Sequence, residues 1–319
     1  MRHSLPRCLR KVRRRTIDKL KLVGRYAAHQ HPAVCSIVNN VGYDDWKMRS
    51  VTETDDVNAR AINTRRPRIG ITMRLELVTD RFYLGRHYSE AIEAAGGVPI
   101  HISLIPDRDY ISAVVDGLDG VLLPGSDSDV DPLRYGAQPH PSLGTVQPIK
   151  DETDLLVLEE IEKRRLPLFA ICFGMQVLNV FRGGTLIQDI ASQVSKAVKH
   201  EQGAPRDRPS HEIKVARSSR LASMAVGEKA LVNSHHHQAI ENLGRELAPV
   251  AWSSDGLIEA VEDARAERFI LGVQWHPELG WKNDKLSQAL FECFIGAARN
   301  HGREKSDDDI YAETAVIVE

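Results

Sequence analysis

Short apolar runs alternate with helical periodicity from residue 68 onward. Four runs rich in β-branched and other apolar residues predict strands at residues 68–73, 98–102, 120–124 and 166–171. The stretches between them carry apolar stripes at helical spacing, or charges that suit a helix dipole, and predict helices at residues 87–95, 110–115 and 151–163. Strands that alternate with helices of this length indicate a parallel sheet covered on both faces.

The pattern changes in the later half of the chain, where strands follow one another with few helices between them. These strands are predicted at residues 212–216, 230–232, 257–261 and 269–275. A closing amphipathic helix is predicted at residues 285–300. We therefore expect an α/β fold in which a mostly parallel sheet carries a smaller, partly antiparallel extension.

The first 66 residues differ from the rest, because they show no sustained apolar periodicity. Residues 1–25 contain ten Lys or Arg and one Asp, although the whole chain has a net charge of −2. This composition favours a disordered basic extension and linker, with Met48 as an alternative start that would remove residues 1–47. A basic arm for nucleic acid and a targeting peptide are the other interpretations.

Composition limits the class of protein. No run of about eighteen apolar residues is present, so no membrane segment is expected. Four cysteines are scattered without a CxxC pair. That usage suits a reducing compartment and a catalytic cysteine, so we expect a cytoplasmic enzyme.

Cys172 ends the strand predicted at 166–171 and is followed by Gly174 and a helix-compatible stretch. A strand, a sharp turn and a helix form the arrangement of a nucleophile elbow, here with sulfur in place of oxygen. The helix N-terminus favours the thiolate over the thiol. Cys172 is therefore the predicted nucleophile.

A cysteine nucleophile needs a base and a group that orients the base. His276 ends a predicted strand, and Glu278 follows it across a tight turn stiffened by Pro277. We expect His276 to act as the base and Glu278 to orient its ring.

An oxyanion requires two N–H donors. The first is expected from Phe173, directly after the nucleophile, and the second from the sharp turn at Gly125 and Ser126.

No metal or cofactor is predicted. The consecutive histidines His235, His236 and His237 point apart in an extended chain, and no carboxylate or cysteine lies at a spacing typical of zinc sites. His200 and His211 are weaker metal-ligand candidates. No glycine-rich phosphate loop is present.

These residues together resemble the class I glutamine amidotransferase fold, and within it the γ-glutamyl-γ-aminobutyrate hydrolase group of peptidase C26-like hydrolases. The resemblance covers about residues 67–301, and residues 302–319 are expected to form a polar tail. The motifs that carry it are Ala-Ile-Cys172-Phe-Gly-Met-Gln, Gly-Val-Gln-Trp-His276-Pro-Glu278, Leu123-Pro-Gly-Ser-Asp and Val232-Asn-Ser-His-His-His-Gln238.

The resemblance implies a flavodoxin-like three-layer fold and hydrolysis of a γ-glutamyl amide through a thioester on Cys172. It also implies that Gln176 and the segment with Ser234, His235 and His236 lie near the glutamyl group. One departure concerns Phe173, since the hydrolase group commonly has arginine at this position, whereas glutaminase subunits that feed a synthetase usually have an aromatic or aliphatic residue.

We therefore expect a stand-alone hydrolase of small γ-glutamyl amides, either γ-glutamyl-γ-aminobutyrate or a related γ-glutamyl amine. It would act in polyamine or amine nitrogen metabolism, without a nucleic-acid or membrane partner. The leaving amine and any homo-oligomer stay open. The main alternative is a glutaminase component that delivers ammonia to a synthetase. A folate-type γ-glutamyl hydrolase and a non-catalytic binding module are less favoured, the first because no secretory segment or disulfide framework is found and the second because Cys172, His276 and Glu278 are all present.

Overall fold

The computed structural model describes residues 65–225, 227–265 and 267–316, and for residues 303–316 it describes the backbone alone. The described residues belong to one compact unit. The predictions made for residues 1–64 lie outside this part of the chain. Within the described part, no helix has both the length and the apolar composition needed to cross a bilayer.

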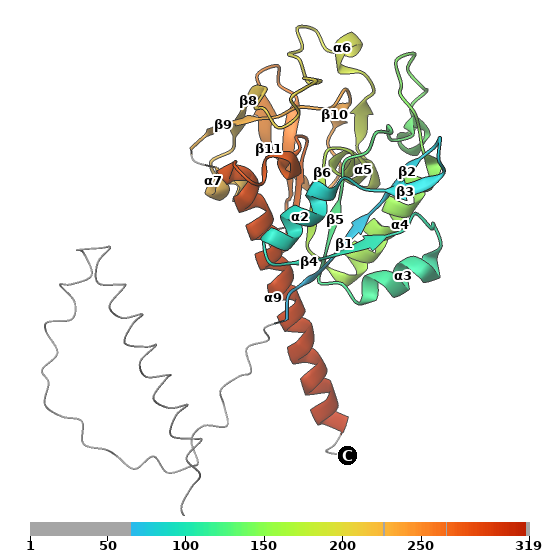
Figure 1. Cartoon of the computed structure of the whole chain (residues 1–319), viewed down its shortest axis with the longest axis vertical. Coiled ribbons are helices and arrows are strands. Elements are labelled where there is room, and N and C mark those ends of the chain that lie inside the picture. Colours follow the sequence, from blue (N-terminus) through green and yellow to red (C-terminus); the bar gives the residue numbers. More distant parts are fainter. Residues whose placement is uncertain (1–64, 226, 266, 317–319) are drawn as a thin grey trace, which may run out of the picture. The chain divides into compact units, whose positions relative to one another are not determined.

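A nine-stranded sheet forms the centre of the unit, in the order β4-β1-β5-β6-β13-β12-β11-β8-β9 (Figure 1). Its first five strands are mutually parallel: β4 (Val98–Ile102), β1 (Arg68–Thr72), β5 (Gly120–Leu123), β6 (Leu168–Ile171) and β13 (Ile270–Val273). The remaining strands pair antiparallel: β12 (Ile258–Asp263), β11 (Leu247–Ser253), β8 (His211–Val215) and β9 (Lys229–Val232). The predicted parallel sheet with an antiparallel extension is confirmed.

Helices cover both faces of the sheet, which gives three layers (Figure 1). One layer contains α2 (Arg86–Ala94), α7 (Arg220–Met224), α8 (Pro277–Gly280) and α9 (Lys285–Val316). The other contains α3 (Arg108–Asp116), α4 (Pro148–Arg164) and α5 (Phe173–Phe181). The short helices η2 (Pro132–Tyr135) and α6 (Ile190–Gln193) lie in connecting segments.

Strand residues alternate between the two layers, as the pleat requires. In β6, Phe169 packs in the core on the α9 side, where it contacts Phe291 edge-on, whereas Leu168 packs in the core on the α4 side. Both side chains are fully buried. Burial on both faces explains why the parallel strands read as continuous apolar runs instead of alternating patterns.

Several elements differ from those predicted. Strand β11 was not predicted, because Pro249 interrupts its pattern; the register of β11 against β12 shifts at this proline, as expected for a proline tolerated at a bulge. Two small sheets were also missed: β2 (Arg74–Glu76) with β3 (Arg81–Tyr83), and β7 (Thr185–Ile187) with β10 (Ala239–Asn242). Helix α9 continues to Val316, past the predicted helix end at residue 300 and into the expected tail.

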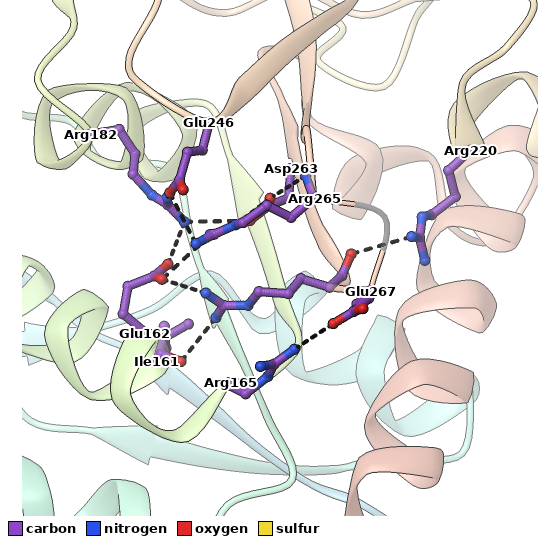
Figure 2. A network of polar contacts seen from close by, with 10 residues as sticks. Ile161, Glu162, Arg165, Arg182, Arg220, Glu246, Asp263, Arg265 and Glu267 are labelled. Carbon is purple, nitrogen blue, oxygen red and sulfur yellow. Dashed lines mark hydrogen bonds and ion pairs between the residues drawn. The ribbon is translucent and has the colours of Figure 1, made fainter.

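A network of charges joins the ends of α4 and α5 to the β11–β12 side of the sheet (Figure 2). Arg182, which is almost fully buried, forms ion pairs with Glu162, with Glu246 at 2.5 Å and with Asp263 at 3.4 Å. Arg265 pairs with the same Asp263 carboxylate at 2.6 Å. Burial would raise the pKa of Asp263, but the hydrogen bonds from Arg265 and the charge of Arg182 lower it below its ordinary value.

Asp263→Asn is expected to lower the free energy of unfolding by about 2–4 kcal/mol, because it removes the fully buried carboxylate that pairs with the almost fully buried Arg182 and the partly buried Arg265. Chemical denaturation measures this loss. The control is Glu267→Gln in the exposed Arg165–Glu267 pair of the same figure, for which a change within about 0.5 kcal/mol is expected. Equal effects of the two variants would contradict the prediction that the ion pairs of Asp263 stabilise the fold more than the exposed pair does.

Candidate active site

The carboxyl ends of the parallel strands meet at one edge of the sheet, where ligands bind in folds of this class. Gly125 follows β5, Cys172 follows β6, and His276 follows β13 within three residues. Because β5, β6 and β13 are adjacent, three segments far apart in sequence are brought to one place.

Cys172 occupies a sharp turn between β6 and α5. Its backbone has φ 52° and ψ −107°, a conformation that is costly for a residue with a side chain. The Cys172 N–H donates to the Val273 carbonyl at 2.7 Å, which holds the turn against β13. A Cβ on Gly174 would lie 2.3 Å from the Leu123 carbonyl oxygen, so α5 packs closely on β5. The predicted elbow is present.

His276 and Glu278 form the buried pair that the sequence predicted. Nδ1 of His276 lies 2.7 Å from Oε1 of Glu278, and both side chains are almost fully buried. Burial alone would lower the pKa of His276, but the Glu278 carboxylate and the Cys172 sulfur raise it to about 10. Burial would raise the pKa of Glu278, and His276 lowers it. At neutral pH the pair is therefore an imidazolium and a carboxylate.

The other ring nitrogen of His276 faces the nucleophile side. Nε2 has no hydrogen-bond partner among the described residues, while Cys172 contributes to the raised pKa of the ring. The sulfur and the imidazole are therefore within electrostatic reach of each other. This is the arrangement that a cysteine nucleophile and its base require.

Asn233 fixes the backbone of His276 and was not predicted from the sequence. Its Oδ1 accepts the His276 N–H at 2.8 Å, and its Nδ2 donates to the His276 carbonyl at 2.8 Å. The two residues are 43 positions apart. The only signal in the sequence was the position of Asn233 in the motif before the three histidines.

The turn after β5 is held by two further residues that were not predicted, Arg74 and Tyr88. The Gly125 N–H donates to the Tyr88 hydroxyl at 3.1 Å, and Arg74 donates to the Gly125 carbonyl and to the same hydroxyl. The Gly125 N–H is thus engaged and is not free to bind an oxyanion. Of the predicted donors, the N–H groups of Ser126 and Phe173 remain. Phe173 is the first residue of α5, so its N–H has no partner within the helix.

A cavity of about 480 Å³ opens beside Cys172. Of the residues expected near a glutamyl group, Gln176, His235 and His236 line it. Ser234 does not line it, because its hydroxyl donates to the His200 carbonyl at 2.6 Å and the side chain is buried. The lining carries both charge signs, with the acidic residues Asp127, Asp129 and Glu201 and the basic residues Arg206 and His237.

Gln176 and Phe173 shape the floor of this cavity. Nε2 of Gln176 donates to the Gln238 carbonyl and to Oε1 of Gln274, both at 3.2 Å. The Phe173 ring is buried, and the ammonium group of the fully buried Lys150 lies 5.4 Å from its centroid. The side chain after the nucleophile is therefore an apolar ring packed inside the protein, and it brings no charge to the cavity.

Three comparisons place the chain among known proteins. The sequence profile of peptidase C26 matches residues 67–278. YvdE of Lactococcus lactis, named a glutamine amidotransferase-like protein, is 39% identical over 188 residues, covering 59% of this chain and 75% of YvdE. The γ-glutamyl-γ-aminobutyrate hydrolase PuuD of Escherichia coli K12 is 35% identical over 229 residues, covering 70% and 89%.

The fold has solved counterparts. The glutaminase domain of Trypanosoma brucei CTPS, determined with bound acivicin, superimposes with a TM-score of 0.51 at 15% identity, covering 73% of this chain and 94% of that domain. This similarity supports the class I glutamine amidotransferase fold. Together with the profile match over two thirds of the chain, these findings show that the protein belongs to the peptidase C26 family of glutamine amidotransferase-like hydrolases.

Proposed function

We propose that this protein hydrolyses γ-glutamyl amides of small amines, with Cys172 as nucleophile, His276 as acid and base, and Glu278 as the residue that orients His276. The observation that carries the proposal is the Cys172 elbow beside the buried His276–Glu278 pair at the mouth of a charged cavity. The similarity to PuuD supports the γ-glutamyl amide as the substrate class.

The reaction begins with attack of the Cys172 thiolate on the γ-carbonyl carbon of the substrate. The oxyanion that forms accepts hydrogen bonds from the N–H groups of Phe173 and Ser126. The His276 imidazolium gives its Nε2 proton to the leaving amine, and the C–N bond breaks, which leaves a γ-glutamyl thioester. His276 then takes a proton from a water molecule that attacks the thioester; Cys172 leaves as thiolate, and glutamate is released.

Both charge signs of the cavity suit this substrate class. A γ-glutamyl group carries an ammonium and a carboxylate on its α-carbon. The acidic Asp127 and Glu201 and the basic Arg206 line the cavity and supply the complementary charges. Because Phe173 offers no charge, an acidic leaving group such as γ-aminobutyrate gains no ion pair at that position. We therefore propose a role in amine nitrogen metabolism with the leaving amine unspecified.

A glutaminase component that delivers ammonia to a synthetase is the second candidate. The apolar residue directly after the nucleophile favours it, and so does the name of YvdE. Both candidates share every step up to the thioester and differ in the leaving group and in the need for a partner.

A panel of γ-glutamyl amines and glutamine, each incubated with the purified chain alone, separates these candidates. Release of glutamate and free amine from γ-glutamyl amines at rates well above those with glutamine supports the hydrolase. Turnover of glutamine alone, and only after a synthetase is added, supports the glutaminase component. Failure to turn over any of them, with Cys172 also unreactive toward acivicin, contradicts both.

Gly125→Ala is expected to lower kcat/KM on the best γ-glutamyl amide by roughly 10–100-fold, because a Cβ there would lie 2.7 Å from the His276 ring and 3.1 Å from the Tyr88 hydroxyl. Steady-state kinetics measure this effect. The matched control is Gly296→Ala in α9, where a Cβ meets no atom within 4 Å and activity should not change. Unchanged activity of Gly125→Ala would show that His276 does not need this close contact.

A further inference from the structure

Four buried side chains converge on one point behind the cavity wall. They come from four separate segments: His200 from the connection after α6, His211 from the start of β8, His236 from the connection between β9 and β10, and Glu259 from β12. We call these four residues the histidine–glutamate cluster. One nitrogen of each histidine and one Glu259 oxygen all lie within 4.8 Å of one another.

The neighbours of the Glu259 carboxylate are the three histidine rings of the cluster. The Glu259 side chain is fully buried, and neither oxygen accepts a hydrogen bond from a described residue. A buried carboxylate without hydrogen bonds is costly, and native structures satisfy such groups or place a cation beside them. The inward-facing nitrogens of the three histidines likewise lack hydrogen-bond partners in the described part of the chain.

Hydrogen bonds on the far side of two of the rings, those of His236 and His200, show which outer nitrogen carries a proton. Nδ1 of His236 lies 2.9 Å from the Gln238 carbonyl, which only accepts, so this nitrogen carries the proton. Nε2 of His200 lies 3.0 Å from the Asp255 carboxylate and is a donor for the same reason. Nδ1 of His211 lies 3.4 Å from the Glu212 carbonyl, a contact that does not fix the tautomer of this ring.

The lone pair of His236 therefore points at a carboxylate, which repels it unless a cation lies between. Protonation of His200 on both nitrogens would provide Glu259 with one donor, but the lone pair of His236 would still face the carboxylate. A divalent cation satisfies all four groups at once. Histidines whose second N–H is held by a carboxylate or a carbonyl are the usual pattern around a protein-bound metal.

The three distances from Glu259 to the histidines are close to those around a tetrahedral ion. Metal–ligand bonds of about 2.0–2.2 Å at tetrahedral angles place neighbouring ligand atoms roughly 3.3–3.6 Å apart. The Glu259 oxygen lies 3.3 Å from His200 Nδ1, 3.5 Å from His211 Nε2 and 3.7 Å from His236 Nε2. Three imidazole nitrogens and one carboxylate oxygen are ligands that Zn²⁺ accepts, and the charges of Glu259 and Asp255 balance the ion.

We propose that the histidine–glutamate cluster binds one Zn²⁺ ion with a structural role. Four protein ligands leave no open position for substrate or water, so the ion takes no part in the chemistry. Its effect is on the cavity wall. His236 lines the cavity, and the Gln238 carbonyl that holds its Nδ1–H also accepts from Gln176. Zinc would thus fix the segment from Ser234 to Gln238 against β8 and β12.

The first test is metal analysis of the full chain, purified without a histidine tag or chelator. We expect about one zinc ion per chain by inductively coupled plasma mass spectrometry. X-ray absorption at the zinc edge should show three imidazole nitrogens and one oxygen, without sulfur. Removal of zinc with dipicolinate should lower Tm by roughly 5–10 °C, and Zn²⁺, but not Mg²⁺, should restore it.

Variants locate the ion, which matters because the chain holds thirteen histidines and four cysteines. His211→Gln and Glu259→Gln should each lose most of the zinc and the Tm response to Zn²⁺. Two controls should retain about one zinc ion per chain: His101→Gln, which changes an exposed histidine of β4, and Cys172→Ser, which removes the thiolate.

Three results would overturn the proposal. The first is wild-type protein that carries less than about a tenth of a zinc ion per chain, even after incubation with Zn²⁺, and shows no change of Tm with Zn²⁺. In that case the cluster would be metal-free, with a protonated histidine beside Glu259. The second is zinc retained by both cluster variants, and the third is sulfur in the absorption spectrum. The wild-type measurements decide the question even where a variant fails to fold, and none of them depends on the proposed hydrolase activity.

Discussion

Cys172→Ala is expected to lower kcat/KM on γ-glutamyl amides by roughly 10⁴-fold or more, because it removes the sulfur proposed to form the acyl intermediate. The free energy of unfolding should change by no more than about 1–2 kcal/mol, since alanine keeps the Cβ and loses only the sulfur. Steady-state kinetics and chemical denaturation of the same preparation measure the two quantities.

Cys293→Ala is the matched control, because Cys293 is a half-buried cysteine of α9 that packs against the core away from the cavity. Its activity should equal that of the wild type. Retention of activity by Cys172→Ala, or its loss in Cys293→Ala, would place the nucleophile elsewhere. A Cys172→Ser variant should fold in the same way and fail to accumulate a thioester.

Glu278→Gln is expected to change both the rate and its pH dependence. In the wild type, activity should hold through neutral pH and fall near pH 10, where the His276 imidazolium loses its proton. Because the Glu278 carboxylate is the largest cause of the raised pKa, its neutralisation should move this alkaline limb down by roughly 1–3 pH units. The rate at neutral pH should fall by about 10²–10⁴-fold. The pH profile of kcat/KM measures both effects.

The pH dependence of the free energy of unfolding should also depend on the protonation of His276. The folded-state pKa of His276 lies above its ordinary value of 6.5, so its contribution to stability is fully present below about pH 6.5 and is lost as pH rises through about 10. Glu278→Gln should remove much of this dependence. Glu228→Gln, at a half-exposed carboxylate paired with Arg217, is the control and should change neither profile. If the alkaline limb of the Glu278→Gln profile stays where it is in the wild type, Glu278 is not the cause of the raised pKa of His276.

The parts of the site that a short segment defines were predictable from the sequence. The elbow at Cys172 combines an apolar strand, a glycine and a helix within ten residues, and the pair of His276 and Glu278 lies within one turn. Both patterns depend on local backbone geometry, so they can be recognised in a single sequence. The alternation of strands and helices predicted the parallel sheet for the same reason.

The residues that support the site were not predictable, because their contacts join distant segments. Asn233 holds the backbone of His276 across 43 positions, and Tyr88 meets Gly125 across 37. In the sequence, Tyr88 looked like one more apolar position on a helix face. The hydrogen bond between the Tyr88 hydroxyl and the turn at Gly125 has no counterpart in the hydrophobic periodicity of the sequence.

The histidine–glutamate cluster shows the same limit. The sequence argued against a metal, because the consecutive histidines 235–237 point apart. In the structure they do contact different groups: His235 the Arg206 carbonyl, His236 the Glu259 carboxylate, and His237 the Asp129 carboxylate. The cluster gathers its members from separate segments of the chain. Sheet pairing brings them together, because β8 and β12 both flank β11.

The most direct test of the proposed mechanism is to trap the acyl intermediate. The full chain is mixed with a saturating γ-glutamyl amide, quenched in acid and digested, and the peptides are analysed by mass spectrometry. We expect one γ-glutamyl acyl group on the peptide with Cys172, sensitive to hydroxylamine and absent in Cys172→Ser. Rapid substrate turnover with no acyl group on Cys172 at any quench time, or an acyl group on another residue, would contradict it.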